Sequence, residues 1–212
     1  MAAGTSTPGR VDRRKERTRS ALLGAARQLL SEGRTNVSIQ EITDAADVGF
    51  GSFYNHFESK EVLFEAAVES TVEDWALLRD QIVAGFDDPA EVFAVSFRMA
   101  GRLQRQAPEL ARALINSGLG VLTHDHGLAP RARRDIEAAT AAGRFDVEDP
   151  DVALMAAGGS LLGLLHWLDL HPHADAAALS DEMAERVLRM FGMPKREAAK
   201  LCTRPLPPQP EL

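Results

Sequence analysis

Apolar residues recur at helical spacing along nearly the whole chain. In the stretch 12–32 a single face collects Leu22, Ala26 and Leu29, and Gly33 follows as a stop. No alternating pattern typical of strands competes, so the predicted fold class is all-α. Residues 118–127 are expected to be irregular or a helix with breaks. Further helices are predicted at about 39–46, 49–57, 60–82, 89–105, 108–117, 130–142, 150–170 and 179–191.

The segment 38–63 carries the clearest local signals. Ser38 stands three positions before Glu41, a capping-box pattern that starts a helix. Asp47 interrupts the apolar pattern before a second short helix, and Ser59 caps a third. The predicted order is therefore helix, tight turn, helix, followed by the start of a longer helix.

The short helix predicted at 49–57 has two different faces. Phe53 and Phe57 are four positions apart, so they share a face that should point into the core. The remaining surface is small in the middle and polar at its edges, which lets a helix press into the major groove of DNA. That surface is formed by Gly51, Ser52, Tyr54, Asn55 and His56.

These residues resemble the TetR family of bacterial transcriptional regulators. The third helix of that family reads roughly V-S-x-G-T-L-Y-x-H-F followed by x-S-K-E-x-L, and residues 48–63 read VGFGSFYNHF followed by ESKEVL. The strong resemblance covers about residues 17–65. It implies an N-terminal three-helix helix-turn-helix DNA-binding domain and a C-terminal helical-bundle domain for ligand binding and dimerisation. The expected divisions are a disordered arm at 1–12, these two domains at 13–70 and 71–195, and a Pro-rich tail at 196–212.

Two positions depart from the family pattern. Asp47 stands where the family usually has Gly in the turn; a left-handed non-Gly residue costs about 1–2 kcal/mol, and Asp tolerates it better than most. Gly49 stands where the family usually has a Ser or Thr cap, and Gly caps only slightly less well. We expect a modest loss of stability and no change of fold.

The resemblance also implies roles for single residues. Each has an ordinary alternative, such as a core aromatic, a solvated lysine or a helix cap, but their order and spacing together favour binding to double-stranded DNA. Asparagine suits adenine, and an exposed phenylalanine suits a thymine methyl. Ser38, Tyr54 and Lys60 match phosphate contacts, His56 matches a backbone or base contact, Gly51 permits close approach, and Phe50, Ser52 and Asn55 occupy base-facing positions.

Charge is divided along the chain in a way that fits this interpretation. The net charge is −7, but residues 1–60 carry nine basic and seven acidic side chains, whereas residues 61–212 carry 15 and 24. Residues 10–19 include six basic and two acidic side chains. We expect Arg14 and Arg17 to bind DNA phosphates. The acidic remainder should repel DNA, so docking by one end is predicted.

The composition also limits the cellular setting. No apolar run was expected to reach the length of a membrane span, and no signal peptide is recognised. The single cysteine, Cys202, excludes an intramolecular disulfide. A cytoplasmic protein that needs no membrane and no cofactor is therefore predicted.

Two C-terminal helices suit a homodimer interface. The run 156–163 places small residues on one stripe, where glycine costs about 1 kcal/mol against Ala unless close packing offsets it. The alternative is close packing within one subunit. A two-fold dimer would place two recognition helices on a palindromic operator, about 34 Å or a multiple apart. The candidate interface residues are Ala156, Gly159, Gly163, Met183, Val187 and Met190.

If the resemblance extends beyond residue 65, the helical body holds a pocket for a small, largely hydrophobic effector. Ligand binding would then favour a conformer with the recognition helices wrongly spaced, and the helix at 60–82 is the expected lever. An apolar stripe is, alternatively, plain core. The candidate lining residues are Trp75, Phe93, Phe97, Leu103, Leu114 and Leu122.

Other hypotheses for function remain open. The protein is alternatively a DNA-binding regulator without a small effector, acting as an activator or under the control of another protein. His124, His126, His166, His171 and His173 suggest a metal-responsive regulator, but their spacing matches no specific site and no metal ligand is assigned. A hydrolase reading of Ser160 lacks the G-x-S-x-G elbow, so no catalytic residue is assigned and the hydroxyl is expected to bond a backbone carbonyl.

Overall fold

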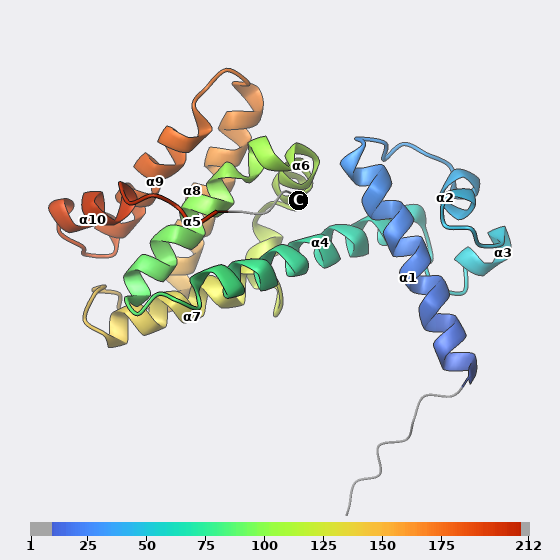
Figure 1. Ribbon diagram of the computed structural model, residues 1–212, viewed down its shortest axis with the longest axis horizontal. Coiled ribbons are helices and arrows are strands. Elements are labelled where there is room, and N and C mark those ends of the chain that lie inside the picture. Colours follow the sequence, from blue (N-terminus) through green and yellow to red (C-terminus); the bar gives the residue numbers. More distant parts are fainter. Residues whose placement is uncertain (1–9, 209–212) are drawn as a thin grey trace, which may run out of the picture. The chain divides into compact units, whose positions relative to one another are not determined.

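The computed structural model describes residues 10–208, and every regular element in that part of the chain is a helix (Figure 1), which confirms the all-α prediction. Most predicted helices appear within a few residues of their expected bounds. The elements are α1 (Arg10–Ser31), α2 (Ile39–Ala45), α3 (Phe50–Phe53), α4 (Lys60–Val83), α5 (Pro89–Gln106), α6 (Pro108–Ser117), the 3-10 helix η1 (Gly118–Thr123), α7 (Leu128–Ala141), α8 (Pro150–Leu170), α9 (Ala176–Met190) and α10 (Lys195–Cys202).

The chain divides into two compact units, Met1–Ser70 and Thr71–Leu212, and the boundary falls within α4. In the first unit α1 packs on α2 and α2 on α3. Their core contains Leu22, Ile42, Phe53 and Leu63, all fully buried. A core of this size is small, so each of its large side chains carries a substantial share of the stability of this unit.

The turn between α2 and α3 is a Schellman motif built around Asp47. The capping box that starts α2 is present: the amide of Glu41 donates to the hydroxyl of Ser38. At the other end Asp47 has φ +52°, and the amide of Val48 donates to the carbonyl of Thr43 at 3.0 Å. The left-handed conformation expected at Asp47 is confirmed.

Helix α3 is shorter than predicted. Regular helix ends at Phe53, although residues 49–57 were expected to be helical. Beyond it the amides of Asn55 and His56 donate to carbonyls three residues back, those of Ser52 and Phe53. Bonds of this type tighten the last turn of a helix, and one i→i−4 bond remains, from the amide of Phe57 to the carbonyl of Phe53 at 3.0 Å.

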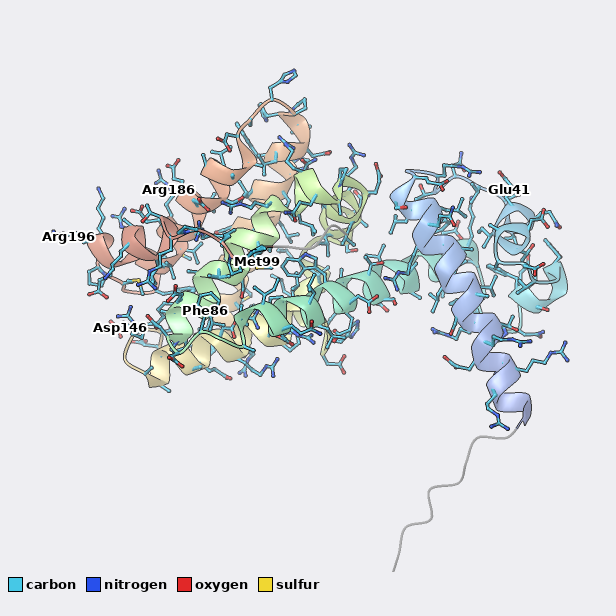
Figure 2. The ribbon with its side chains drawn as sticks, in the orientation of Figure 1. Glu41, Phe86, Met99, Asp146, Arg186 and Arg196 are labelled. Atoms are coloured by element: carbon cyan, nitrogen blue, oxygen red, sulfur yellow. The ribbon has the colours of Figure 1, made fainter. Side chains whose placement is uncertain are left out.

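The second unit is organised around α5, which packs against α6, α7, α8, α9 and α10. Met99 of α5 is buried among these helices, whereas Arg186 and Arg196 project from their surface (Figure 2). Gly101 lets α5 approach α9 closely, because a Cβ there would lie 2.5 Å from the hydroxyl oxygen of Ser180. The core of this unit is therefore tightly packed where α5 crosses α9.

The C-terminal region differs from its prediction. Residues 196–212 were expected to form a Pro-rich tail, but α10 occupies Lys195–Cys202 and buries Ala198, Leu201 and Cys202. The apolar residues of this short segment recur at helical spacing after Pro194, so tertiary packing stabilises a helix that is marginal alone. The disordered arm predicted at 1–12 lies largely outside the described residues, and α1 begins at Arg10.

Helix α8 is long and apolar enough to cross a membrane, judged by length and composition alone, with a mean hydropathy of 1.4. The expectation that no run would reach that length is therefore corrected. The helix packs against α5, α6, α7 and α9, and buries Leu164, Leu165 and Leu168. One face of α8 therefore belongs to the core of this unit, whereas another apolar face, with Met155 and Leu170, is exposed.

Candidate nucleic-acid interface and ligand cavity

Helix α3 presents two aromatic side chains outward and holds two inward. The exposed fractions of Phe50 and Tyr54 are 47% and 56%, whereas Phe53 and Phe57 are buried. The ring of Tyr54 meets Phe50 edge-on at 5.9 Å and Phe53 at 5.4 Å. These contacts hold the Tyr54 ring at the surface, and no hydrogen bond joins its hydroxyl to another of the described residues.

The base-facing and close-approach positions are open. Asn55 and Gly51 are exposed and Ser52 is half-buried. The amide nitrogen of Asn55 lies 3.5 Å from the carbonyl oxygen of Gly51, which is at the weak limit of a hydrogen bond. Asn55 is therefore free to exchange this contact for one with a base edge.

His56 is half-buried, and its Nδ1 is a buried atom without a hydrogen-bond partner among the described residues. Burial lowers the pKa of His56, and the positive charges of Lys15 and Arg19 lower it further. The ring is therefore neutral at physiological pH. It can act as a hydrogen-bonding group there, but it does not supply a positive charge for phosphates.

Ser38 and Lys60 are both engaged in bonds within the protein. The hydroxyl of Ser38 donates to the carboxylate of Glu41 at 2.8 Å, and the Lys60 ammonium donates to the carbonyl of Val37 at 3.1 Å. Lys60 thus links the first turn of α4 to the segment before α2. A Lys60→Ala variant would change this link and any phosphate contact together.

Two basic side chains of α1 belong to the candidate interface. Arg14 and Arg17 are exposed, as a phosphate contact requires. Arg19 instead lies over the ring of Phe57, with 5.2 Å between the guanidinium carbon and the ring centroid. Helix α1 therefore exposes Arg14 and Arg17, while its Arg19 packs on an aromatic ring.

Substitutions at Tyr54 and Asn55 should separate the contacts that position the protein on DNA from the contacts that read the base sequence. We expect Tyr54→Phe to weaken binding to all DNA sequences by a similar factor, because it removes one expected contact with a DNA phosphate. Asn55→Ala should instead change the preference among sites, by about 1–3 kcal/mol at one base pair. Fluorescence anisotropy with a set of single-base operator variants measures both. A Tyr54→Phe protein that changed base preference would contradict this assignment.

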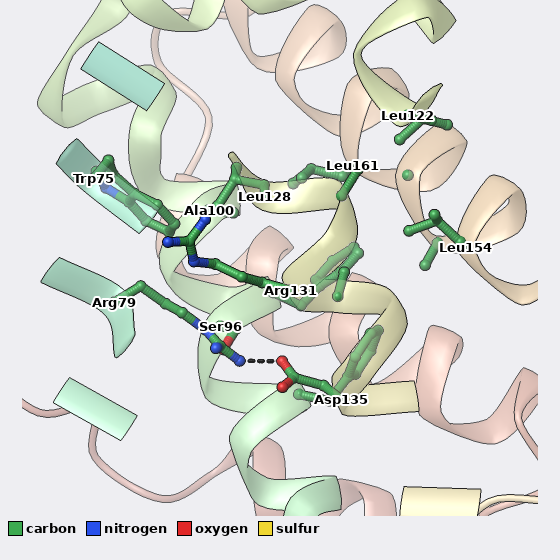
Figure 3. A pocket seen from close by; sticks show the side chains of 16 residues that line it. Trp75, Arg79, Ser96, Ala100, Leu122, Leu128, Arg131, Asp135, Leu154 and Leu161 are labelled. Atoms are coloured by element: carbon green, nitrogen blue, oxygen red, sulfur yellow. Dashed lines mark hydrogen bonds and ion pairs between the residues drawn. The ribbon is translucent and has the colours of Figure 1, made fainter. Parts of the chain in front are cut away.

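The second unit contains a cavity of about 80 Å³ between α4, α5, α7, α8 and η1 (Figure 3). Its walls are mostly apolar, and a few polar groups converge at one side. Four of the six predicted lining residues, Trp75, Phe93, Phe97 and Leu122, line it, while Leu103 and Leu114 are buried elsewhere. The other lining residues are Arg79, Ser96, Ala100, Leu128, Ala129, Arg131, Ala132, Asp135, Leu154, Ala157, Gly158 and Leu161.

The polar side of the cavity is an ion pair between α4 and α7. The buried Arg79 guanidinium pairs with the carboxylate of Asp135 (Figure 3) and donates to the hydroxyl of Ser96 at 2.7 Å. It also donates to Asp80 at 2.8 Å. Arg79 is therefore fully engaged in a fixed orientation at the edge of an apolar space.

A second buried arginine, Arg131 of α7, holds two acidic residues of α4. Its guanidinium donates to Glu73 at 2.8 Å and to Asp80 at 2.7 Å. Glu73 also accepts a hydrogen bond from the amide of Gly127 at 2.6 Å. Of these charged residues Arg79, Arg131 and Asp135 line the cavity, whereas Glu73 and Asp80 do not.

Asp135 is the acidic residue of this cluster whose pKa is raised. Burial raises the pKa of Asp135 to about 6, and this effect outweighs the attraction of Arg79. Because the pKa in the folded state exceeds the unfolded value of 3.8, the native state favours the protonated form. Stability from this group is fully present below about pH 3.8 and is lost as pH rises through about 6.

An Asp135→Asn variant should lack this pH dependence. Between pH 4 and pH 7 the wild type should lose up to about 3 kcal/mol of unfolding free energy relative to the variant. Urea unfolding at four pH values measures the difference. Parallel stability profiles for the two proteins would show that Asp135 titrates normally.

The residues predicted for a dimer interface lie in different environments. Gly159 and Gly163 face open space, since a Cβ built on either would meet nothing within 4 Å. Met190 is 53% exposed, and Ala156 and Met183 are half-buried. Val187 is 2% exposed within the core of its own chain, so the prediction that it faces a partner is corrected.

The open stripe of α8 continues beyond the predicted residues. Val152, Met155, Trp167 and Leu170 are 55%, 57%, 45% and 62% exposed and recur with the glycines at helical spacing. A contiguous exposed apolar face of this kind is a candidate interaction surface. We define these four side chains with Gly159 and Gly163 as the α8 stripe.

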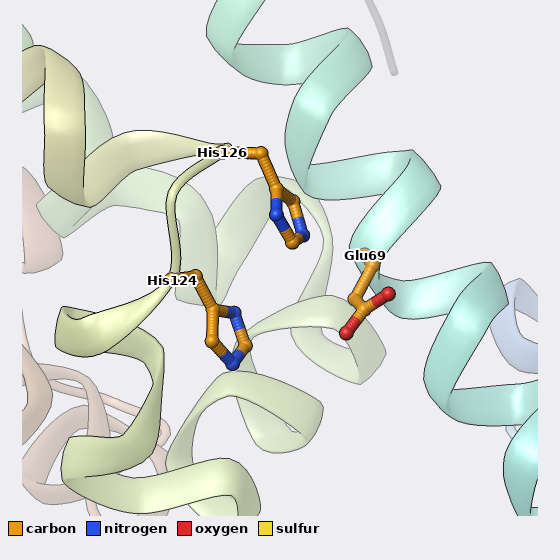
Figure 4. Close-up of side chains that lie close together, drawn as sticks. All are labelled: Glu69, His124 and His126. Carbon is orange, nitrogen blue, oxygen red and sulfur yellow. The ribbon is translucent and has the colours of Figure 1, made fainter.

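The histidines do not gather into one site. The rings of His124 and His126 are stacked with centroids 5.2 Å apart (Figure 4), and His126 contacts the carboxylate of Asp125 at 3.0 Å. His171 is instead bonded to the carbonyl of Trp167 at 2.7 Å at the end of α8. The hydroxyl of Ser160 donates to the carbonyl of Ala156 at 2.7 Å, as predicted for a serine inside an apolar helix.

Comparisons with known proteins define the class. Residues 22–67 match the model of bacterial regulatory proteins of the tetR family, and residues 88–204 match the model of the tetracyclin repressor-like C-terminal domain. The chain belongs to the TetR family. It is a helix-turn-helix regulator that binds DNA, as the residues of α2 and α3 predicted.

Several relatives extend over most of the chain. The crystal structure of RolR in complex with resorcinol is 37% identical, covers 92% of this chain and 98% of RolR, and has a TM-score of 0.79. The Escherichia coli K12 protein named "Probable acrEF/envCD operon repressor" is 26% identical and covers 87% of this chain and 91% of its own. FadR from Bacillus subtilis with stearoyl-CoA, at 15% identity over 81% of this chain and 96% of FadR, shares the fold with a TM-score of 0.59.

Proposed function

We propose that this protein is a dimeric, cytoplasmic repressor that a small hydroxylated aromatic compound releases from a palindromic operator. The observation that carries the proposal is the cavity of the second unit, where apolar walls meet the Arg79–Asp135 pair. A largely apolar pocket with a few convergent polar groups is the usual form of a small-molecule site. The exposed face of α3 supplies the DNA-binding part of the proposal.

The cavity favours a phenol over other classes of ligand. Trp75, Phe93 and Phe97 offer aromatic surfaces, and the carboxylate of Asp135 beside Arg79 can accept a hydrogen bond from a hydroxyl group. Resorcinol, which is bound in the RolR structure, has a single ring and two donor groups.

Helix α4 supports a mechanism for release. The same continuous helix supplies Leu63 and Ala67 to the core around α3 and supplies Trp75 and Arg79 to the cavity. A ligand that displaces Arg79 or Trp75 would shift the position of α4 in the second unit. The shift can be no larger than the difference in ligand affinity between the two conformers.

The α8 stripe supports the dimer. Exposed glycines permit close helix approach, and the flanking Trp167 and Leu170 add apolar area that a second copy would bury. Because a dimer interface of this type is two-fold symmetric, it would present two copies of α3 to one operator. Met183 and Met190 of α9 border this surface in the proposal.

Isothermal titration calorimetry with resorcinol tests the ligand, with Zn²⁺ alone as a second titrant. We expect resorcinol to bind the wild type and to bind Arg79→Met at least about tenfold more weakly. Arg186→Met, at an exposed arginine of α9, is the matched control and should bind like the wild type. Binding of Zn²⁺ without binding of resorcinol would favour the metal-responsive alternative, and binding of neither would favour a regulator without a small effector.

A further inference from the structure

Gly158 of α8 is in contact with Leu122 of η1 across one wall of the cavity. A Cβ built on Gly158 would lie 2.3 Å from one terminal methyl of Leu122 and 2.9 Å from the other. The Leu122 side chain therefore occupies the space that any side chain at position 158 would need. Gly159, the next residue, has nothing within 4 Å of its Cβ position, so the close approach is specific to Gly158.

The segment that carries Leu122 is lightly packed. No residue of η1 is fully buried, and the exposed fraction of Leu119 is 65%. The segment is bounded by Gly118 and Gly127, which both have positive φ, at +59° and +75°. By contrast the facing wall, with Trp75 and Arg79 on α4, is held by the buried ion pairs. Leu122 is thus the large apolar lining residue on the least constrained element of the cavity.

From this contact we infer that Gly158 and Leu122 set the size of ligand that the cavity accepts. The inference rests on the proposed function, because it concerns the same cavity. An apolar cavity of about 150 Å³ holds benzene, so about 80 Å³ admits one ring only if a wall yields. Leu122 is the wall that yields, because η1 is lightly packed, and the missing side chain of Gly158 lets Leu122 lie against α8 and out of the cavity.

Substitutions at the two positions should act in opposite directions. Figure 3 shows Leu122 on the α8 side of the cavity and Trp75 on the opposite side. Gly158→Ala removes the space behind Leu122 and drives its side chain toward Trp75, which narrows the cavity. Leu122→Ala removes the side chain and widens the cavity. Discrimination between ligands that differ by one or two carbons should change roughly tenfold.

Calorimetric titration of the full chain with two ligand series tests this inference. The hydroxylated series is resorcinol, 4-ethylresorcinol and 4-hexylresorcinol, and the hydrocarbon series is toluene and naphthalene. We expect Leu122→Ala to raise the affinity for a larger ligand relative to that for a smaller ligand of the same series by about tenfold. Gly158→Ala should lower the same affinity ratio by about tenfold. Leu119→Ala in η1 and Gly24→Ala in α1 are matched controls that should leave these ratios unchanged.

The outcomes separate the inference from the proposed function. Resorcinol binding to the wild type with the same size ratios in both variants would overturn the inference and leave the proposed function standing. Toluene binding with shifted ratios, but no resorcinol binding, would support the inference and overturn the phenol class. Binding of no member of either series to any protein would overturn both. If Gly158→Ala fails to fold, the ratios of Leu122→Ala decide the inference.

Discussion

A Phe53→Ala protein is expected to lose operator binding at concentrations that saturate the wild type. Phe53 is fully buried in the small core that α1, α2, α3 and the start of α4 form. Truncating a buried phenylalanine costs about 3–5 kcal/mol, which is a large fraction of the stability of a unit of this size. Urea unfolding followed by circular dichroism, together with an anisotropy titration on the operator, measures both losses.

Phe50→Ala is the matched control, because Phe50 lies three positions earlier on the same helix and is 47% exposed. Its free energy of unfolding should stay within about 0.5 kcal/mol of the wild type. The preference for one base pair of the operator should nevertheless change, since Phe50 occupies a base-facing position. If Phe50→Ala were the more destabilising of the two, the orientation of α3 would be wrong.

The second large effect is expected at Arg131. Arg131→Ala should lower the free energy of unfolding by about 2–3 kcal/mol, because it leaves Glu73 without its arginine partner and Asp80 with Arg79 alone. Thermal and urea unfolding measure the loss. The affinity for resorcinol should fall as well, since Arg131 lines the cavity and orders the α4 residues around it.

Arg133→Ala is the control for Arg131, two positions further along α7. Its side chain is 42% exposed and pairs with Asp151 and Glu137 at the surface, so its loss should cost under about 1 kcal/mol. Equal destabilisation by the two substitutions would contradict the structural role assigned to the buried network.

The DNA-binding unit was predictable because its signals are local. The capping box at Ser38, the turn at Asp47 and the spacing of Phe53 and Phe57 each depend on a few neighbouring residues, and all appear in the structure. The end of α3 was not predictable, because the change to i→i+3 bonding after Phe53 leaves the side-chain periodicity nearly unchanged.

The polar part of the cavity was missed for a physical reason. Arg79 and Arg131 lie in charge-rich helices, where such residues usually form a solvated face, and nothing in the local pattern marks them as buried. Only the pairing of α4 with α7, far apart in the sequence, brings Asp135 to Arg79. Leu103 was wrongly placed in the cavity because periodicity identifies a buried face without identifying what that face covers.

The C-terminal helix was missed for a related reason. Four prolines after residue 203 suggested an extended tail, and the short run before them has few apolar residues. Ala198, Leu201 and Cys202 are nevertheless buried, because α9 and α5 provide the surface that they cover. A helix of this length depends on its neighbours, so its own residues give only a weak signal.

Genomic fragments selected with the purified protein, followed by footprinting of the best site while resorcinol is added, test whether this protein is a dimeric repressor controlled through its cavity. We expect a protected palindrome of about 15–30 bp with two half-sites on one face of the DNA, and loss of that protection as resorcinol is added. A single protected half-site, or a palindrome whose protection no phenol changes, would contradict a dimeric repressor controlled through the cavity.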